Sequence, residues 1–136
     1  MEEFDIAIIG GGPAGIMAAI AASADLNIVL LEKNSSLGSK LLITGGGRCN
    51  ITNEKPIKKL LNSFHDKNFL KHSFYTFTNE MLLDLFRNRG LDFIVEDNNR
   101  VFPETEKSQD ILAILKYYLK AVSYTHLRAH ETAANL

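Results

Sequence analysis

The stretch "FDIAIIGGGPAGIMAAIAAS", residues 4–23, decides the fold of this chain. Its first six residues form an isoleucine-rich apolar run, which predicts a β-strand buried on both faces, as strands of parallel sheets are. Gly10 ends this run. Pro13 then opens an alanine-rich segment that predicts a helix up to Ser23, because proline is tolerated in the first helical turn. The stretch therefore predicts a strand, a glycine turn and a helix.

A second strand and an acidic residue complete the unit. The run "NIVLL", residues 27–31, predicts another buried strand, which ends at Glu32. Gly10, Gly12 and Gly15 match the G-x-G-x-x-G pattern, whose glycines allow a tight turn, close approach to a pyrophosphate and close packing of helix on strand. The predicted fold class is α/β, a Rossmann-like domain with a parallel sheet.

The same residues predict a dinucleotide site. The amino terminus of the helix, at Pro13 and Ala14, offers unpaired N–H groups and a partial positive charge to phosphates. The Glu32 carboxylate can accept hydrogen bonds from both ribose hydroxyls, which disfavours a ligand with a 2′-phosphate. We therefore predict FAD or NAD rather than NADP here. The alternative is that the glycines serve only a turn.

A second glycine triplet favours FAD over NAD. An NAD-binding unit usually continues from its acid into another helix, whereas residues 32–53, "EKNSSLGSKLLITGGGRCNITN", read as a polar loop that can follow an extended ligand. Gly45, Gly46 and Gly47 lack β-carbons, so their N–H groups can approach a phosphate or the edge of a reduced flavin, as in an anion-binding nest.

The three residues after this triplet are further candidates. Arg48 has two interpretations, a positive charge that favours reduced flavin or an ion pair with an acid of the fold. Cys49 is expected to be a small buried residue beside the cofactor, because no C-x-x-C motif supports a dithiol relay. Asn50 is expected to orient the loop through side-chain to main-chain hydrogen bonds.

Four segments together resemble a known family: "GGGPAGIMAA", "LLEKN", "LGSKLLITGGGRCNITN" and "RVFPETEKSQDIL". The sequence resembles bacterial NAD(P)/FAD-dependent oxidoreductases of the aminoacetone-oxidase-like or BaiN-like type, over nearly all of residues 4–115. The resemblance implies an FAD-binding domain, hydride transfer between a small organic substrate or NAD(P)H and an acceptor, and NAD(P)H as a candidate electron donor. Residues 1–121 supply no convincing general acid or base, so the catalytic residues stay unknown and are expected outside this segment.

The resemblance also implies positions along the cofactor. Lys33 would lie beside the adenosine end, Gly38 and Lys40 in the loop toward the phosphates, and residues 45–50 near the pyrophosphate and the flavin ring. In the family a substrate domain interrupts the cofactor domain, and a carboxy-terminal segment completes it. Residues 1–121 are therefore expected to be a partial FAD-binding domain, truncated before the substrate domain and inactive alone.

The residues from Lys55 onward predict helices and a hairpin but no catalytic or binding site. Helices are expected from Lys55 and from Thr78 to Gly90, and "LDFIVEDNNRVFP" predicts a hairpin that turns at Asn98 and Asn99. A last helix is expected with Ser108 as its cap. Its predicted apolar face consists of Ile111, Leu112, Leu115 and Leu119. Three aromatic residues before Thr78 are expected to be packing groups (Phe74, Tyr75 and Phe77). The two histidines that precede them are expected to be solvated (His65 and His72).

Residues 122–136 are expected to be a non-native tail. "VSYTHLRAHET" resembles the translated read-through of a common transposon-based sequencing adapter, and the residues that follow fit the adapter as well. The helical spacing of His126 and His130 would suit a metal, but on this interpretation it carries no meaning. We therefore predict no metal site.

Composition bounds the function classes. The 136 residues have a net charge of −1, 46% hydrophobic residues and one cysteine. Lysines and acids are interspersed, without a basic block or a membrane-length apolar run, so we expect a small-molecule substrate, no nucleic acid, no membrane and a cytoplasmic location. The oligomeric state is not predicted. Two alternatives are a tRNA-modifying flavoprotein and a protein that holds FAD or NAD without turnover.

Overall fold

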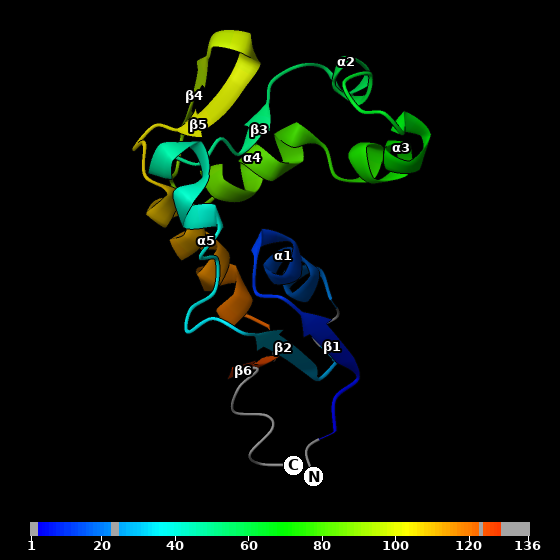
Figure 1. Cartoon of the computed structure of the whole chain (residues 1–136), viewed down its shortest axis with the longest axis vertical. Helices are drawn as coiled ribbons and strands as arrows, with labels where there is room; N and C mark the ends of the chain where they lie inside the picture. Colours follow the sequence, from blue (N-terminus) through cyan, green and yellow to red (C-terminus); the bar gives the residue numbers. More distant parts are fainter. Residues whose placement is uncertain (1–2, 23–24, 123, 129–136) are drawn as a thin grey trace. The chain divides into compact units, whose positions relative to one another are not determined.

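The structure is a computed structural model that describes residues 3–22, 25–122 and 124–128. It divides into two compact units, the first made of residues 1–43 with 112–136 and the second of residues 44–111. Figure 1 labels their helices and strands. In the described ranges no helix is both long and apolar enough to span a bilayer.

The first unit contains the predicted β-α-β arrangement. Strand β1 (Ile6–Ile9) leads into α1 (Pro13–Ala21) and β2 (Ile28–Glu32), and β1 pairs with β2 in parallel, with Ile6 opposite Ile28. The sheet has the order β1-β2-β6 (Figure 1). Helix α5 (Ser108–Lys120) begins in the second unit and enters the first at Leu112. The α/β fold with a parallel sheet is confirmed.

The two predicted strands differ in burial. β2 is buried along almost its whole length, as predicted. In β1 burial alternates, and Ile9 is 87% exposed, so the prediction of a strand buried on both faces is wrong there. The alternation separates the two faces of the strand: Ile6 and Ile8 are half-buried on one face, and Ala7 and Ile9 are exposed on the other. Within the described residues only β2 pairs with β1, so it is also an edge strand. No described residue buries the face of β1 that carries Ala7 and Ile9.

Strand β6 (Tyr124–Arg128) lies in the segment that we expect to be a non-native tail. It pairs in parallel with β2, with Ile28 opposite Tyr124 and Glu32 opposite Arg128. A parallel ladder is made of main-chain hydrogen bonds, so such a strand can form whatever the origin of its side chains. His126 lies in this strand, whereas His130 falls outside the described residues.

The second unit combines helices with a small antiparallel sheet of order β3-β5-β4 (Figure 1). The 3-10 segment η1 (Leu41–Gly47) leads into it from the first unit. The further elements, in chain order, are β3 (Thr52–Asn53), α2 (Ile57–Leu61), α3 (Lys67–Thr76), α4 (Asn79–Arg87), β4 (Phe93–Glu96), η2 (Asp97–Asn99) and β5 (Arg100–Pro103).

Most predicted elements of this unit are confirmed. The Thr78 hydroxyl caps α4 by accepting a hydrogen bond from the Met81 N–H (3.2 Å). The hairpin turns through Asn98 and Asn99, whose φ angles are +63° and +60°. Ser108 is the first residue of α5 rather than the cap before it. The predicted apolar face of α5 is buried in full: Ile111, Leu112, Leu115 and Leu119.

Helix α3 was not predicted. None of its residues is fully buried, so little of its sequence is fixed by contact with the core. The Asp66 carboxylate caps it, accepting a hydrogen bond from the Phe69 N–H (3.0 Å).

Candidate functional site

The glycine turn after β1 is built as the motif requires. Gly10 has a φ of +100°, which favours glycine, and its N–H donates to the Leu31 carbonyl (2.8 Å), so the turn begins at the end of the ladder. A β-carbon at Gly15 would collide with the Gly10 carbonyl oxygen. The close packing of helix on strand therefore depends on the absence of a side chain at residue 15.

Gly12 differs from Gly15 because it faces open space. A β-carbon there would meet no atom within 4 Å. Gly12 precedes α1, whose first residue is Pro13 and whose first turn carries no acid. Pro13 and Ala14 are exposed. The positive end of α1 and the bare turn thus leave room for a pyrophosphate.

The Glu32 carboxylate joins the end of β2 to the glycine turn. Oε2 accepts from the Gly11 N–H (2.7 Å), and Oε1 accepts from the main-chain N–H (2.8 Å) and the side-chain amide (2.7 Å) of Asn34. These donors, Asn34 foremost, hold the pKa of Glu32 below its usual value although the side chain is only 8% exposed. A carboxylate has about four lone-pair sites, so capacity remains for a ribose hydroxyl.

Two contributors to this turn were missed by the motif pattern, which assigns no role to its second position. Gly11 is buried, its N–H binds Glu32, and its carbonyl accepts from the Gly38 N–H (2.8 Å). A β-carbon on Gly11 would collide with Leu37. Asn34 supplies the other donors to Glu32. The available signal was Gly11 itself, the middle glycine of residues 10–12, to which the motif assigns no role.

The second glycine segment forms a closed loop within its own unit. Gly45, Gly46 and Gly47 have φ angles of +57°, +68° and +90°, and Cys49 has +63°. The Thr44 carbonyl accepts from the Cys49 N–H (3.0 Å). A β-carbon at Gly45 would lie 2.9 Å from the main-chain nitrogen of Asn50. The loop therefore needs glycine for its own backbone at this position.

Asn50 and Cys49 fix this loop in different ways. With its amide nitrogen turned toward the main-chain oxygens of Thr52 (2.9 Å) and Val101 (3.3 Å), Asn50 donates to both. This agrees with the expected orienting role. Cys49 is 3% exposed, and burial raises the pKa of its thiol, against a smaller lowering by a hydrogen bond with Thr44. The thiol therefore remains protonated near neutral pH, as suits a packing residue.

Arg48 is held by acids of the fold. Its Nη1 lies 2.6 Å from Glu96 Oε1 and 2.9 Å from Glu106 Oε1. The guanidinium also stacks over Phe102, with its Cζ 4.2 Å from the ring centroid. Hydrogen bonds to Glu96 and then Glu106 raise the Arg48 pKa above its ordinary value. Of the two interpretations, the ion pair has direct geometric support.

A substitution pair tests what Arg48 contributes. We expect a double-mutant cycle of Arg48→Met and Glu96→Gln to give a favourable but small coupling free energy, because the pair is part-exposed and solvent screens it. If the ion pair is the whole role, the flavin midpoint potential of the full-length protein should stay unchanged in Arg48→Met. Denaturant unfolding and a redox titration measure the two quantities. A shifted potential with zero coupling would favour the flavin-facing interpretation instead.

The structure thus divides the predicted site residues between its two units. Gly10, Gly12, Pro13, Ala14, Gly15 and Glu32 come together in the first unit. Lys33 and Lys40 are exposed on the segment after β2. Gly45, Gly46, Gly47, Arg48, Cys49 and Asn50 form the closed loop of the second unit.

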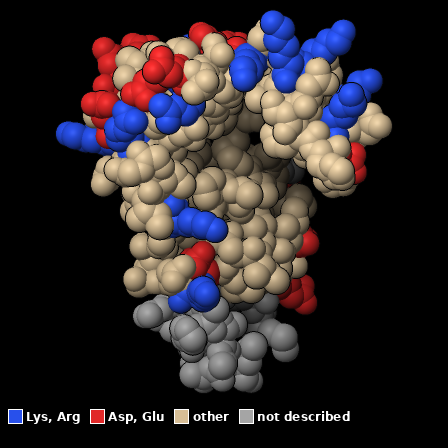
Figure 2. Space-filling model, turned by 45° about the horizontal axis from the view of Figure 1, so that its top comes forward, with Lys and Arg blue, Asp and Glu red and all other residues tan. Residues whose placement is uncertain are grey.

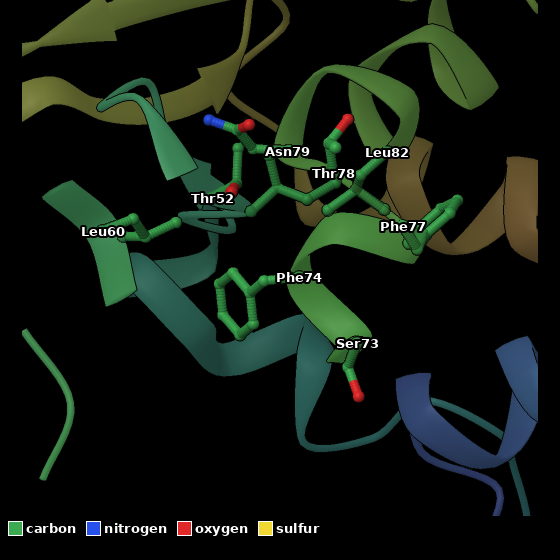
Figure 3. A pocket seen from close by; sticks show the side chains of 9 residues that line it. Thr52, Leu60, Ser73, Phe74, Phe77, Thr78, Asn79 and Leu82 are labelled. Carbon is green, nitrogen blue, oxygen red and sulfur yellow. The ribbon is translucent and has the colours of Figure 1, made fainter. Parts of the chain in front are cut away.

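A pocket of about 360 Å³ lies among helices of the second unit. Figure 3 shows its lining side chains, with the Phe74 ring from α3 and Leu60 from α2 among them. The Asn79 amide in this lining is committed to the main-chain oxygens of Asn53 (2.8 Å) and Lys55 (3.2 Å). No lining residue carries a charge, so the pocket offers apolar surface rather than acid or base chemistry.

Fold and glycine turn define a Rossmann-type dinucleotide-binding domain. The HI0933-like protein Rossmann domain family matches residues 4–134, and the chain belongs to this family. The resemblance to BaiN-like flavoproteins is thereby confirmed, since the chain is 34% identical over 129 residues to a 3-dehydro-bile acid delta(4,6)-reductase of Clostridium scindens. That alignment covers 90% of this chain and 31% of the reductase.

Two other similarities bear on function and fold. The chain is 33% identical over 118 residues to the ribosomal RNA dihydrouridine synthase of Escherichia coli, covering 85% of this chain and 28% of the synthase. The crystal structure of Thermovibrio ammonificans THI4 superposes with a TM-score of 0.58 at 15% identity, over 91% of this chain and 38% of that one. The chain spans less than a third of the length of these two curated relatives.

Proposed function

We propose that this chain is the FAD-binding segment of a flavin-dependent oxidoreductase. The whole protein would transfer hydride between a small organic substrate or NAD(P)H and an acceptor. One observation carries the proposal: open space at Gly12 lies at the positive end of α1, on a turn tied to the Glu32 carboxylate. FAD, when bound, supplies the two-electron chemistry.

In this proposal the residues of the chain bind and orient the cofactor. Gly12 and the first turn of α1 hold the pyrophosphate through main-chain N–H groups. Glu32 accepts hydrogen bonds from the ribose and repels a 2′-phosphate. Lys33 and Lys40 add positive charge along the adenosine end and the phosphates. The loop from Gly45 to Asn50 is assigned to the flavin side, and no residue of the chain is assigned as general acid or base.

Anaerobic reduction of the full-length gene product tests the proposal. We expect a bound flavin whose visible absorbance bleaches with NADH or NADPH, or with a reducing substrate, and returns with an acceptor. The 136-residue chain alone should retain FAD weakly and show no turnover. A full-length product that binds no flavin would refute the proposal, and a bound flavin that no donor reduces would favour a non-catalytic role.

Substitution of Cys49 provides a separate test. We expect Cys49→Ser to leave the rate of flavin reduction within about twofold, because a protonated, buried thiol contributes packing rather than redox chemistry. Stability should fall slightly, since serine places a hydroxyl where a small hydrophobe stood. Stopped-flow reduction and thermal unfolding measure the two effects. Loss of turnover with flavin still bound would show that the thiol takes part in the reaction.

A nucleic-acid substrate is the second candidate. The observation that favours it is the similarity to ribosomal RNA dihydrouridine synthases, 33% identical in Escherichia coli and 30% in Haemophilus influenzae. In this alternative the same flavin would act on an RNA base rather than on a small molecule. The expectation of no nucleic-acid partner therefore stays a prediction. Incubating the reduced full-length protein with each substrate class distinguishes the two candidates.

A further inference from the structure

Helices α2 and α3 carry a concentration of positive charge. Residues 55–76 contain five lysines, at positions 55, 58, 59, 67 and 71, and one acid, Asp66. The formal net charge of the whole chain is −1, so its value does not reveal this local excess of positive charge. Figure 2 shows Lys and Arg gathered over the part of the second unit that these helices form.

We call the exposed polar face of these helices the α2–α3 surface. It consists of Lys58, Asn62, Lys67, Asn68, Lys71 and Tyr75. Two adjoining shallow hollows mark it, of about 370 and 520 Å³, and Asn68, Lys71 and Tyr75 line both. No carboxylate belongs to either lining. The hollows thus present ammonium groups, amides and one aromatic ring to the same space.

In the part of the chain that the structure describes, the lysines of this surface form no ion pair, whereas three arginines of the same unit do. Arg48, Arg87 and Arg100 each form ion pairs with carboxylates of the fold. Within the described ranges, no acid lies at ion-pair distance from the three lysines of the α2–α3 surface. Like charges so gathered repel one another, and a bound polyanion would relieve that repulsion.

The surface also has an aromatic component held in place from beneath. Tyr75 is 54% exposed, so its expected packing role is wrong, whereas Phe74 packs as expected. The Phe74 ring stands edge-to-face against Phe64, with 5.4 Å between centroids. This contact and the Asp66 cap hold α3, and with it the spacing of Lys67, Lys71 and Tyr75.

We propose that the α2–α3 surface binds the phosphate backbone of single-stranded RNA. The lysine ammonium groups can bind successive phosphates of the backbone. The Asn62 and Asn68 amides can form hydrogen bonds with sugars or base edges, and the Tyr75 ring can stack on an unpaired base. A duplex would hide its bases from that ring. The surface is separate from the residues assigned to FAD, so this inference does not depend on the proposed function.

The α2–α3 surface could not be predicted from the sequence, because its lysines come from two separate helices. Eight residues, with Asp66 among them, lie between Lys58 and Lys67, so no basic run stands out. Only the packing of α2 beside α3 brings both into one lining. The predicted absence of a nucleic-acid partner depended on that missing run.

Fluorescence anisotropy with the full-length gene product and a labelled oligouridylate of about 12 nucleotides tests the proposal. The logarithm of the binding constant should fall with the logarithm of salt concentration with a slope of about −2, or about −0.7 for each of three phosphates. The triple substitution Lys58→Gln, Lys67→Gln, Lys71→Gln should weaken binding at least about tenfold and bring the slope near zero.

A matched triple provides the control. Lys107→Gln, Lys116→Gln and Lys120→Gln remove the same charge from outside the α2–α3 surface and should change affinity less than about twofold. Tyr75→Ala should weaken binding about tenfold with the salt slope unchanged, and Tyr75→Phe should restore it. Equal weakening by both triples would overturn the proposal, because binding would then follow net charge alone.

Two further outcomes are decisive. Sedimentation with phosphatidylserine vesicles, in the absence of RNA binding, would overturn the proposal in favour of a membrane surface. The flavin absorbance of each variant shows whether it is folded. If the triple variant loses its flavin, the RNA affinities of the single variants Lys71→Gln and Tyr75→Ala are compared with wild type instead, and wild-type affinity in both would overturn the proposal. RNA binding without any flavin would refute the proposed function and leave this inference standing.

Discussion

Gly15→Ala is expected to lower the free energy of unfolding by about 3 kcal/mol, the upper end of what overpacking costs. The added β-carbon would collide with the Gly10 carbonyl oxygen, which is main chain and cannot rotate away. Alanine is favoured over glycine in a helix by about 1 kcal/mol, so the steric cost must exceed that gain. Such a loss is a large part of the stability of an ordinary domain.

Gly12→Ala is the matched control for this substitution. Its β-carbon would meet no protein atom within 4 Å, so stability without cofactor should change by less than about 0.5 kcal/mol. If a pyrophosphate occupies that space, FAD affinity should fall at least about tenfold, a loss of about 1.4 kcal/mol. One glycine thus tests the fold and the other tests the ligand.

Denaturant unfolding of apoprotein and flavin fluorescence titration measure the two effects in the full-length gene product. Wild-type affinity in Gly12→Ala would show that Gly12 serves only the turn, which is the alternative left open from the sequence. Wild-type stability in Gly15→Ala would contradict the close contact between α1 and the turn. Either result would remove one role from the glycine motif without affecting the other.

The β-α-β unit could be predicted from sequence because its determinants are local. Gly10, Pro13 and the apolar runs around them specify strand, turn and helix within a few residues of each other. Thr78 as a cap and Asn98 in a turn were predictable for the same reason. Such patterns report backbone preferences directly.

The parts that failed depend on distant partners. Arg48 contacts Glu96 and Glu106 across sequence separations of 48 and 58 residues. The sequence around Arg48 does not predict which acid it pairs with. The exposure of Ile9 depends on whether another element covers that face of β1, and an isoleucine run is the same in either case. Local propensity cannot supply tertiary context.

Glu32→Ala is expected to damage both the fold and the cofactor site. It would leave the buried Gly11 N–H without an acceptor and remove the partner of Asn34, at a cost of about 2 kcal/mol in stability. FAD affinity should also fall at least about tenfold, because hydrogen bonds to a charged acceptor are worth about 1.5–3 kcal/mol. Unfolding and flavin titration again measure the two effects.

The pH dependence of Glu32 has a definite sign. Its folded pKa lies below the ordinary 4.5, because main-chain N–H groups of Asn34 and Gly11 stabilise the charged form. The stability it contributes is therefore fully present above about pH 4.5 and is lost as pH falls through the folded pKa. The stability difference between wild type and Glu32→Gln should be largest near neutral pH and shrink below about pH 4.

Two controls separate the carboxylate from general acid effects. Glu104→Gln removes an exposed carboxylate and should change stability by less than about 0.5 kcal/mol. Asn34→Ala deletes one donor to Glu32, the side-chain amide, and leaves the main-chain N–H in place. It should cost about 1 kcal/mol and keep most of the FAD affinity, since the Gly11 contact persists.

The combination of outcomes distinguishes a ribose ligand from a structural brace. If Glu32 only braces the turn, Asn34→Ala and Glu32→Gln should weaken FAD binding in proportion to the stability that each one loses. If it also holds the ribose, Glu32→Gln should lose far more affinity than its stability cost accounts for. A Glu32→Gln variant with wild-type FAD affinity and a pH-independent stability difference would contradict both roles.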